Sequence, residues 1–355
     1  MANCKLENIN ISSTALLSPP REVRQEIPLT TELMYRVQQF RQTMEQIFDG
    51  EDPRLLAIVG PCSIHNLESG REYAARLKKL SDEIADSVYV VMRVYFEKPR
   101  SVLGWKGLIN DPYMNDTFHI GEGIRMARHF LKTIATIGLP AATEILDPLM
   151  PQYIGDLISW SAIGARTVES QTHREIASGI STPVGFKNST DGSLATAINA
   201  MQAAMGQHHF LGVTEDGLPA VFNTIGNSYP QLVLRGGKKP NYNAEIIQQC
   251  EESLRKASVP AHIIVDCSHG NSSKRPERQC DVMRDLLTQI ENGNRSIKGF
   301  MLESNLEWGN QPMTGDPRKL RPGVSVTDAC IDWKTTEQIL KEAHQRYSAV
   351  LAARG

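Results

Sequence analysis

Four side chains of the kinds that hold a transition-metal ion lie close to the ends of apolar runs in this sequence. Cys62 lies in VGPCSIH, His269 in DCSHGN, Glu303 in MLESN and Asp328 in VSVTDAC. A thiolate, an imidazole and carboxylates suit a borderline divalent ion such as Mn²⁺, Fe²⁺, Co²⁺ or Zn²⁺. No short spacing joins the four, and Cys62 taken alone is better explained as a buried, inert thiol. The metal site is therefore predicted only if the fold brings these positions together.

A second set of side chains near such ends is cationic. A single strand-end arginine is usually a solvated rim residue, but several that converge would repel one another without anions between them. Guanidinium forks match phosphate and carboxylate oxygens, so the set predicts one or two small substrates with several negative charges. Its members are Arg93, Lys98, Arg100, Lys106, Arg166, Lys187 and Arg235, with the acidic Glu144 at the end of another run.

The elements that would position these residues alternate along the chain. Short apolar runs rich in β-formers are separated by amphipathic helical stretches, a pattern of parallel strands with helical crossovers. Eight such strands favour a closed (β/α)8 barrel of the α/β class, in which residues just past the strands meet at one face. The predicted strands are 55–59, 88–95, 139–145, 163–168, 183–187, 232–235, 263–267 and 297–302.

Helices are predicted between the strands, and two further segments lie outside the alternation. Residues 1–50 read as an N-terminal extension with one helix at 31–48, and residues 51–355 as the catalytic barrel. An insert around 208–225 reads as a β-hairpin, because Asp216-Gly217 suits a turn with positive φ. The predicted barrel helices are 68–84, 123–137, 151–160, 173–178, 193–205, 244–257, 277–290 and 335–353.

Charge and composition exclude several classes of protein. The net charge of -2 argues against a general binder of nucleic acid or membrane surfaces. The N-terminus lacks the apolar segment of a signal peptide, and no apolar stretch is long enough to span a membrane. The six cysteines show no CxxC spacing, so they predict thiols in a reducing compartment and a cytoplasmic protein.

Longer blocks around these residues resemble a known family. The blocks GPCSIH, MRVYFEKPRSVLGWKGLINDP, SWSAIGARTVESQTHRE, PVGFKNSTDGS, LRGGKKPNY, DCSHGNSSK, MLESN and SVTDACIDW are similar to the type I 3-deoxy-D-arabino-heptulosonate 7-phosphate (DAHP) synthases. The similarity runs from about Arg54 to the end. It implies a metal-dependent barrel enzyme that condenses phosphoenolpyruvate with erythrose 4-phosphate and releases phosphate, the first step toward the aromatic amino acids.

The resemblance also implies roles for individual residues. The metal ligands would be Cys62, His269, Glu303 and Asp328, and the catalytic residues Lys98, Glu144 and His269. Ser101 departs from the threonine of many members but keeps the hydroxyl. The phosphoenolpyruvate contacts would be Arg93, Lys98, Arg166, Lys187 and Arg235, and the contacts to the aldose phosphate Arg100, Ser101 and Lys106.

Members of this family are commonly inhibited by one aromatic amino acid, next to a neighbouring subunit's N-terminal extension. The matching positions are Pro148, Gln152, Ser181 and Gly212. Pro148 and Gly212 resemble the tyrosine-inhibited members, which predicts tyrosine as the inhibitor and a homodimer or homotetramer. Ordinary turn chemistry is the other explanation for both residues.

Other functions stay open at this level. A metal-dependent aldolase, or a synthase that uses arabinose 5-phosphate, would need the same kinds of residue on the same barrel. A Schiff-base mechanism at Lys187 is conceivable. A catalytically silent sensor of an aromatic amino acid or a sugar phosphate is the alternative outside enzymes.

Overall fold

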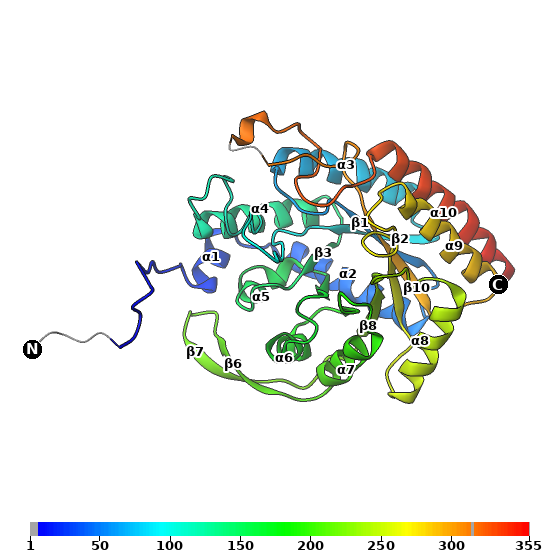
Figure 1. The fold of residues 1–355 in the computed structure, drawn as a ribbon, viewed down its shortest axis with the longest axis horizontal. Helices are drawn as coiled ribbons and strands as arrows, with labels where there is room; N and C mark the ends of the chain where they lie inside the picture. The colour runs from blue at the N-terminus through cyan, green and yellow to red at the C-terminus, as the bar shows by residue number, and fades with distance from the viewer. Residues whose placement is uncertain (1–5, 314–315, 355) are drawn as a thin grey trace, which may run out of the picture.

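Eight parallel strands close into a barrel in the computed structural model, which describes residues 6–313 and 316–354 (Figure 1). The strands are β1 (Leu55–Gly60), β2 (Val88–Arg93), β3 (Ala141–Glu144), β4 (Trp160–Ile163), β5 (Val184–Lys187), β8 (Pro230–Leu234), β9 (Ile263–Asp266) and β10 (Ile297–Glu303). Their order round the barrel is β1-β10-β9-β8-β5-β4-β3-β2, and β1 pairs with both β2 and β10. The predicted (β/α)8 architecture is confirmed.

Helices lie outside the strands and follow them in the order that the alternation predicts (Figure 1). In the part of the chain that the structure describes, no helix combines the length and the apolar character that a membrane crossing needs. The barrel helices are α3 (Leu67–Glu83), α4 (Ile120–Thr136), α5 (Met150–Ile154), α6 (Gln171–Gly179), α7 (Leu194–Met205), α8 (Ala244–Lys256), α9 (Arg278–Glu291) and α10 (Trp333–Arg354), with 3-10 turns η1 (Gly155–Leu157) and η2 (Pro317–Lys319).

Strand side chains are buried on both faces of the barrel wall. In β1 every residue is buried, and alternate residues join two different apolar clusters. Leu56 and Ile58 pack inside the barrel with Trp160 and Met301, whereas Val59 packs outward in the cluster that includes the helices. This alternation is what a closed sheet with a filled interior requires. The inward-pointing residues fill the interior of the barrel with apolar side chains.

The predicted bounds of the fourth strand are wrong. The sequence pattern predicts a strand at 163–168 after a helix that ends at Trp160, but β4 covers Trp160–Ile163. Residues 165–169 form turns, in which the Gly164 carbonyl accepts hydrogen bonds from the backbone N–H groups of Thr167 and Val168. Val168 is apolar and buried in that turn, so the sequence pattern there resembles the end of a strand, and the predicted strand begins and ends too far along the chain.

A long helix closes the amino-terminal end of the barrel. Helix α2 (Thr31–Asp49) begins where the Thr30 hydroxyl accepts a hydrogen bond from the Leu33 N–H at 3.2 Å, and it ends at Gly50 with φ of 82°. Its Phe48 ring stacks at 5.5 Å on His262, which directly precedes β9. The carboxyl ends of the strands therefore form the open mouth.

Two further elements lie beside the barrel. The predicted hairpin is confirmed as β6 (His209–Val213) and β7 (Pro219–Asn223), and Gly217 takes φ of 77° in the turn. A short helix that the sequence pattern did not predict, α1 (Pro20–Glu26), reaches this hairpin through a 2.5 Å ion pair of Arg21 with Asp216. Figure 1 shows residues 6–16 projecting away from the barrel. The first five residues of the predicted extension, Cys4 included, lie outside the described residues.

Candidate active site

Three of the four predicted metal ligands form one tight group at the mouth. Cys62 lies two residues after β1, Glu303 ends β10, and Asp328 lies in the loop between β10 and α10. One donor atom from each lies within 4.8 Å of the others, and Cys62 Sγ is 3.8 Å from Asp328 Oδ2. His269 Nε2 lies 3.7 Å from Glu303 Oε1 and 4.0 Å from Asp328 Oδ2. The structure thus brings all four side chains together.

Local backbone geometry aims these side chains inward. His269 takes a left-handed conformation with φ of 55°, which its carbonyl stabilises by accepting a 2.8 Å hydrogen bond from the Lys274 N–H. Before Cys62, a Cβ at Gly60 would lie 2.9 Å from the Arg93 carbonyl oxygen, so only glycine fits there without a shift. Gly60 and the Pro61 that follows it carry the chain from the strand to the thiol.

The chemistry of this donor set fits a divalent cation. A thiol and two carboxylates whose donor atoms approach within 4.8 Å repel one another once all are ionised. Burial and then Glu303 raise the pKa of Cys62 to about 11, although the nearby Lys98 ammonium lowers it. A bound divalent ion would remove this repulsion, and its binding would displace the thiol proton.

Lys98 connects the metal-like group to the cationic one. Its Nζ lies 3.1 Å from Cys62 Sγ and 3.3 Å from the Cys62 carbonyl oxygen. Burial lowers the pKa of Lys98, but the charges of Cys62, Glu303 and Asp328 outweigh burial and hold it above its usual value. Lys98 is therefore an ammonium at neutral pH and can donate a proton.

The deepest cation of the mouth has a free donor. Arg93 ends β2, is 1% exposed and stacks 4.2 Å above the ring of Tyr95. Its Nη2 is 3.2 Å from Glu303 Oε1, whereas its Nη1 is buried and has no hydrogen-bond partner among the described residues. A buried N–H without a partner costs about 1 to 3 kcal/mol, so this donor suits a bound anion.

Lys187 ends β5 and is 4% exposed, with Nζ 2.9 Å from Asp266 Oδ2. Burial lowers the pKa of Lys187, but Asp266 more than compensates and the pKa lies above its usual value. An ammonium held in this way is a poor amine nucleophile, which argues against the Schiff-base alternative.

The remaining predicted cations lie nearer the rim. Lys98, Arg100, Lys106 and Arg166 line one cavity of about 1240 Å³, and Arg100 Nε donates to the Trp105 carbonyl oxygen at 2.7 Å. Arg235 is half-buried after β8. Ser101 is exposed in the loop between β2 and α4 and is not among the residues that line the cavity.

Glu144 ends β3 and packs against the chain after β4. A Cβ at Gly164 would lie 2.1 Å from Glu144 Oε1, so this glycine makes room for the carboxylate. Glu144 acts electrostatically on both Lys98 and Lys187. This places the third predicted catalytic residue among the cations of the mouth.

Asp266 is an acidic residue of the mouth that the sequence analysis missed. It ends β9, is fully buried, and contacts both Lys187 and His269. Burial raises the pKa of Asp266, but His269 and Lys187 hold it well below its usual value. The predicted strand ran through Cys267, so Asp266 was taken as an interior residue of that strand. An ionisable residue at the end of a strand is the feature that identified the other site residues, and it would have identified Asp266 had the strand ended one residue earlier.

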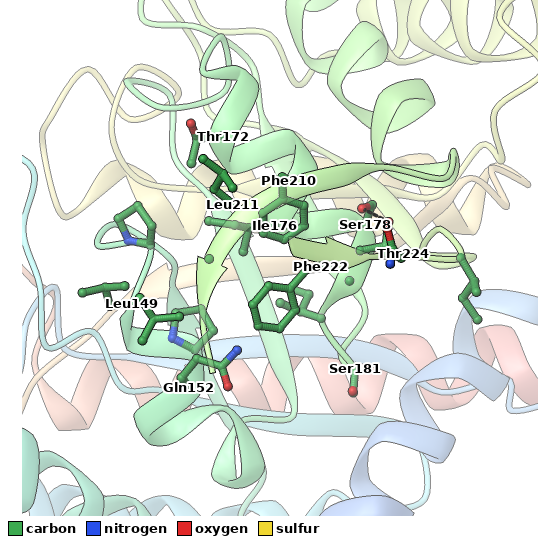
Figure 2. A pocket seen from close by; sticks show the side chains of 18 of the residues that line it. Leu149, Gln152, Thr172, Ile176, Ser178, Ser181, Phe210, Leu211, Phe222 and Thr224 are labelled. Carbon is green, nitrogen blue, oxygen red and sulfur yellow. Dashed lines mark hydrogen bonds between the residues drawn. The ribbon is translucent and has the colours of Figure 1, made fainter. Parts of the chain in front are cut away.

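A second cavity, of about 480 Å³, lies outside the barrel between α5, α6 and the hairpin. Pro148, Gln152, Ser181 and Gly212, the four predicted inhibitor contacts, all line it. Figure 2 shows Phe210 beside Phe222 in this cavity, with ring centroids 5.7 Å apart, and Gln152 and Ser181 on the same side of the rings.

A smaller cavity of about 350 Å³ lies next to the second one. Gln152 and Ser181 line both, and the smaller cavity also contains Glu97 and Glu144. Glu97 in turn lines the large cavity at the mouth together with Lys98. The space outside the barrel is therefore linked to the mouth through a few shared side chains.

Comparison with known proteins assigns this arrangement to a family. The model of the DAHP synthetase I family matches residues 27–341. The chain belongs to the DAHP synthetase I family. It is 51% identical to the Tyr-sensitive phospho-2-dehydro-3-deoxyheptonate aldolase of Salmonella typhimurium, over 98% of both chains. It is 48% identical to the Phe-sensitive protein of that name from Escherichia coli K12, over 99% of this chain and 100% of that one.

A solved structure supports the same assignment to the DAHP synthetase I family. The phospho-2-dehydro-3-deoxyheptonate aldolase of Francisella tularensis SCHU S4 superposes with a TM-score of 0.93 at 42% identity, covering 96% of this chain and 99% of that one. The fold of this chain is thus shared with that protein over almost the whole length of both.

Glu97 gives a prediction about stability and pH. Glu97 is 6% exposed, and burial followed by repulsion from Asp147 raises its pKa from 4.5 to about 8. Between these pH values the folded state keeps a proton that the unfolded chain has lost, so Glu97 lowers the free energy of unfolding as the pH rises. Glu97→Gln should therefore be more stable than the wild type by up to about 4 kcal/mol at pH 8 and by less than about 1 kcal/mol at pH 5.

Urea unfolding at pH 5, 6.5 and 8 measures this difference. Glu169→Gln, which changes an exposed carboxylate after β4, serves as the control and should show the wild-type pH dependence. A constant difference between Glu97→Gln and the wild type at all three pH values would contradict a raised pKa at Glu97.

Proposed function

We propose that this protein is a 3-deoxy-7-phosphoheptulonate synthase, which condenses phosphoenolpyruvate with D-erythrose 4-phosphate and releases inorganic phosphate. The observation that carries the proposal is the mouth of the barrel, where Cys62, His269, Glu303 and Asp328 lie beside buried cations. Membership of the DAHP synthetase I family supports the same reaction.

The cations are assigned to the two substrates. The phosphoenolpyruvate is bound by Arg93, Lys98, Arg166, Lys187 and Arg235, and the unpartnered Nη1 of Arg93 supports this role for the deepest of them. Arg100, Ser101 and Lys106 bind the phosphate of the aldose from the loop after β2. Binding both anions offsets their mutual repulsion and holds the reacting carbons together, an effect worth up to about 7 to 11 kcal/mol when the geometry is good.

We propose Cys62, His269, Glu303 and Asp328 as the ligands of a divalent ion, Mn²⁺, Fe²⁺, Co²⁺ or Zn²⁺. When bound, such an ion supplies Lewis acidity toward the aldehyde group of the second substrate.

The chain's own residues move the protons. The enol carbon of phosphoenolpyruvate forms a bond to the aldehyde carbon, and Lys98 Nζ donates a proton to the oxygen that becomes a hydroxyl. Glu144 orients the water that adds to the second carbon of phosphoenolpyruvate and accepts a proton from it. The phosphate then leaves with cleavage of the carbon–oxygen bond and takes the proton of the new hydroxyl, which becomes the ketone oxygen. His269 contributes as a proposed metal ligand, because its Nε2 lies beside Glu303 and Asp328.

The outer cavity is proposed as the site of feedback inhibition by tyrosine. It offers the stacked rings of Phe210 and Phe222 to an aromatic side chain, and the amide of Gln152 to its polar groups. The absence of a side chain at Gly212 leaves room beside Phe222.

We propose residues 1–50 as the region that contacts another subunit in a homodimer or homotetramer. Leu6, Ile9, Ile11 and Leu16 are exposed on the projecting segment, and exposed apolar residues in a row favour a protein contact. We also propose a cytoplasmic location, since the five cysteines of the described residues are all free thiols.

The first experiment on the reaction measures phosphate release from phosphoenolpyruvate with each candidate aldehyde. Erythrose 4-phosphate should support turnover, a chelator should abolish it, and added Mn²⁺ should restore it. Turnover with arabinose 5-phosphate instead would favour the related synthase. Tight binding of substrates without turnover in the presence of metal would favour the silent sensor.

Cys62→Ser tests the metal site. Serine keeps the size of the side chain but loses the thiolate ligand, so Mn²⁺ affinity should fall by at least about 100-fold, beyond the usual cost of losing an outer-shell partner. Turnover should fall with it. Metal content after dialysis and phosphate release are both measured, with Cys280→Ser on α9 as the matched control. If the Cys62→Ser protein keeps both properties, the ligand assignment is wrong.

Gly212→Ser tests the inhibitor site. A Cβ at this position would lie 2.8 Å from the Phe222 ring, so serine crowds the cavity without touching the mouth. Half-inhibition by tyrosine should need about tenfold more tyrosine or higher, with turnover in its absence unchanged. Val221→Ser, on the hairpin but outside the cavity lining, is the control. Inhibition by phenylalanine alone in the wild type would refute the choice of tyrosine.

A further inference from the structure

Asp266 contacts one predicted metal ligand, His269, and one predicted substrate-binding cation, Lys187. A single carboxylate oxygen, Oδ2, lies 2.9 Å from Lys187 Nζ and 2.9 Å from His269 Nδ1. The other oxygen, Oδ1, accepts hydrogen bonds from the Ser268 hydroxyl at 2.6 Å and from the Ser268 N–H at 3.1 Å. Both oxygens of this fully buried carboxylate are therefore occupied.

The contact with Asp266 decides which nitrogen of His269 is free. A carboxylate beside Nδ1 makes Nδ1 the protonated donor and leaves the lone pair of Nε2 bare. Nε2 is the nitrogen that faces Glu303 and Asp328, at 3.7 and 4.0 Å. The ring is also held by the Ser268 hydroxyl, 2.7 Å from Nδ1. Asp266 thus sets the tautomer and the orientation that a metal ligand needs.

The same carboxylate also contacts a residue on a strand that is not its neighbour, the proposed substrate contact Lys187. Lys187 ends β5, Asp266 ends β9, and β8 lies between these two strands. An ion pair alone would need only one oxygen of Asp266 and one partner. Instead Lys187 and His269 share Oδ2, so a change in the hydrogen bond to one partner alters the electron density available to the other.

We propose that Asp266 is a positioning residue that couples the metal ligand His269 to the substrate cation Lys187, so that metal and phosphoenolpyruvate strengthen each other's binding. The inference rests on the proposed function. When the anion engages Lys187, less of the ammonium's charge is directed at Oδ2, and the carboxylate accepts more strongly from His269 Nδ1–H. The imidazole then donates more strongly through Nε2. Because coupling between binding sites is reciprocal, bound metal must favour phosphoenolpyruvate by the same factor.

Asp266→Asn tests the coupling in binding experiments that do not depend on turnover. Calorimetric titration of the full-length apoprotein with Mn²⁺, with and without phosphoenolpyruvate, gives both affinities and the factor that relates them. In the wild type, phosphoenolpyruvate should tighten Mn²⁺ binding by about fivefold or more. In Asp266→Asn, Mn²⁺ affinity should fall by about 10- to 100-fold, and the factor should fall at least severalfold.

Two further variants guard against a trivial result. Ser268→Ala removes one donor to Asp266 and one contact to His269 while keeping the ion pair, so it should lower Mn²⁺ affinity in the same direction by a smaller factor. It also provides the test if Asp266→Asn does not fold. Asp281→Asn removes an exposed carboxylate on α9 and should match the wild type in every titration.

The outcomes separate the inference from the proposed function. Wild-type Mn²⁺ affinity in Asp266→Asn, or an unchanged coupling factor, would overturn the inference while the wild-type protein still forms product. Absence of product from phosphoenolpyruvate and erythrose 4-phosphate with the Mn²⁺-loaded wild type would instead overturn the proposed function. An unchanged Mn²⁺ affinity in Ser268→Ala together with a non-folding Asp266→Asn would also count against the coupling.

Discussion

Eight parallel strands that close on themselves present their carboxyl ends at a single mouth, and in this chain most of those ends carry charge. Arg93, Glu144, Lys187, Asp266 and Glu303 are each the last residue of their strand. Ends of neighbouring strands would also meet in an open sheet, but the first and last strands of the chain would then lie at opposite edges. Pairing of β1 with β10 is therefore what brings the thiol of one end beside the carboxylate of the other.

Burial of this charge is tolerated because four of the five strand-end groups form ion pairs with each other. Arg93 pairs with Glu303, and Lys187 with Asp266, in contacts of 3.2 and 2.9 Å between side chains that are almost wholly buried. Such pairs add little net stability, since desolvation cancels much of their attraction. Their value lies in holding cations in place for anions and carboxylates in place for a metal. The apolar interior below, closed by α2, stabilises the barrel on which they stand.

The sequence predicted the position of candidate site residues that lie at or just after a strand. It predicted less well the position of residues in long loops. Cys62 and Glu303 lie at or just past strands whose apolar runs are easy to recognise. Asp328 lies far along the loop after β10, and its place depends on bridges such as Gly309 with Cys330 that no local pattern announces. Residue chemistry named Asp328 as a possible fourth ligand, but no predicted strand end placed it beside the other three.

The errors have physical causes of the same kind. Val168 is an apolar residue that is buried by a turn. Its side chain therefore looked like part of a strand in the sequence, and the predicted fourth strand began too late. Asp266 was hidden because a buried carboxylate within an apolar run looks like an interruption until its partners are known. Of its two partners, Lys187 comes from β5 and meets Asp266 only once the strands have paired, whereas His269 lies three residues further along the chain, in a loop whose backbone conformation the apolar run does not predict.

The hairpin lies outside this network of charges, so the proposed inhibitor site is separate from the proposed active site. It is inserted between α7 and β8, so its residues can change without moving any strand end. Its cavity still reaches the mouth, because Gln152 and Ser181 line a neighbouring space that contains Glu97 and Glu144. A ligand that displaced Gln152 or Ser181 would change the lining of the space that also contains Glu97, the residue before Lys98 in the chain. The proposed inhibitor site and the proposed active site therefore use different elements of the fold.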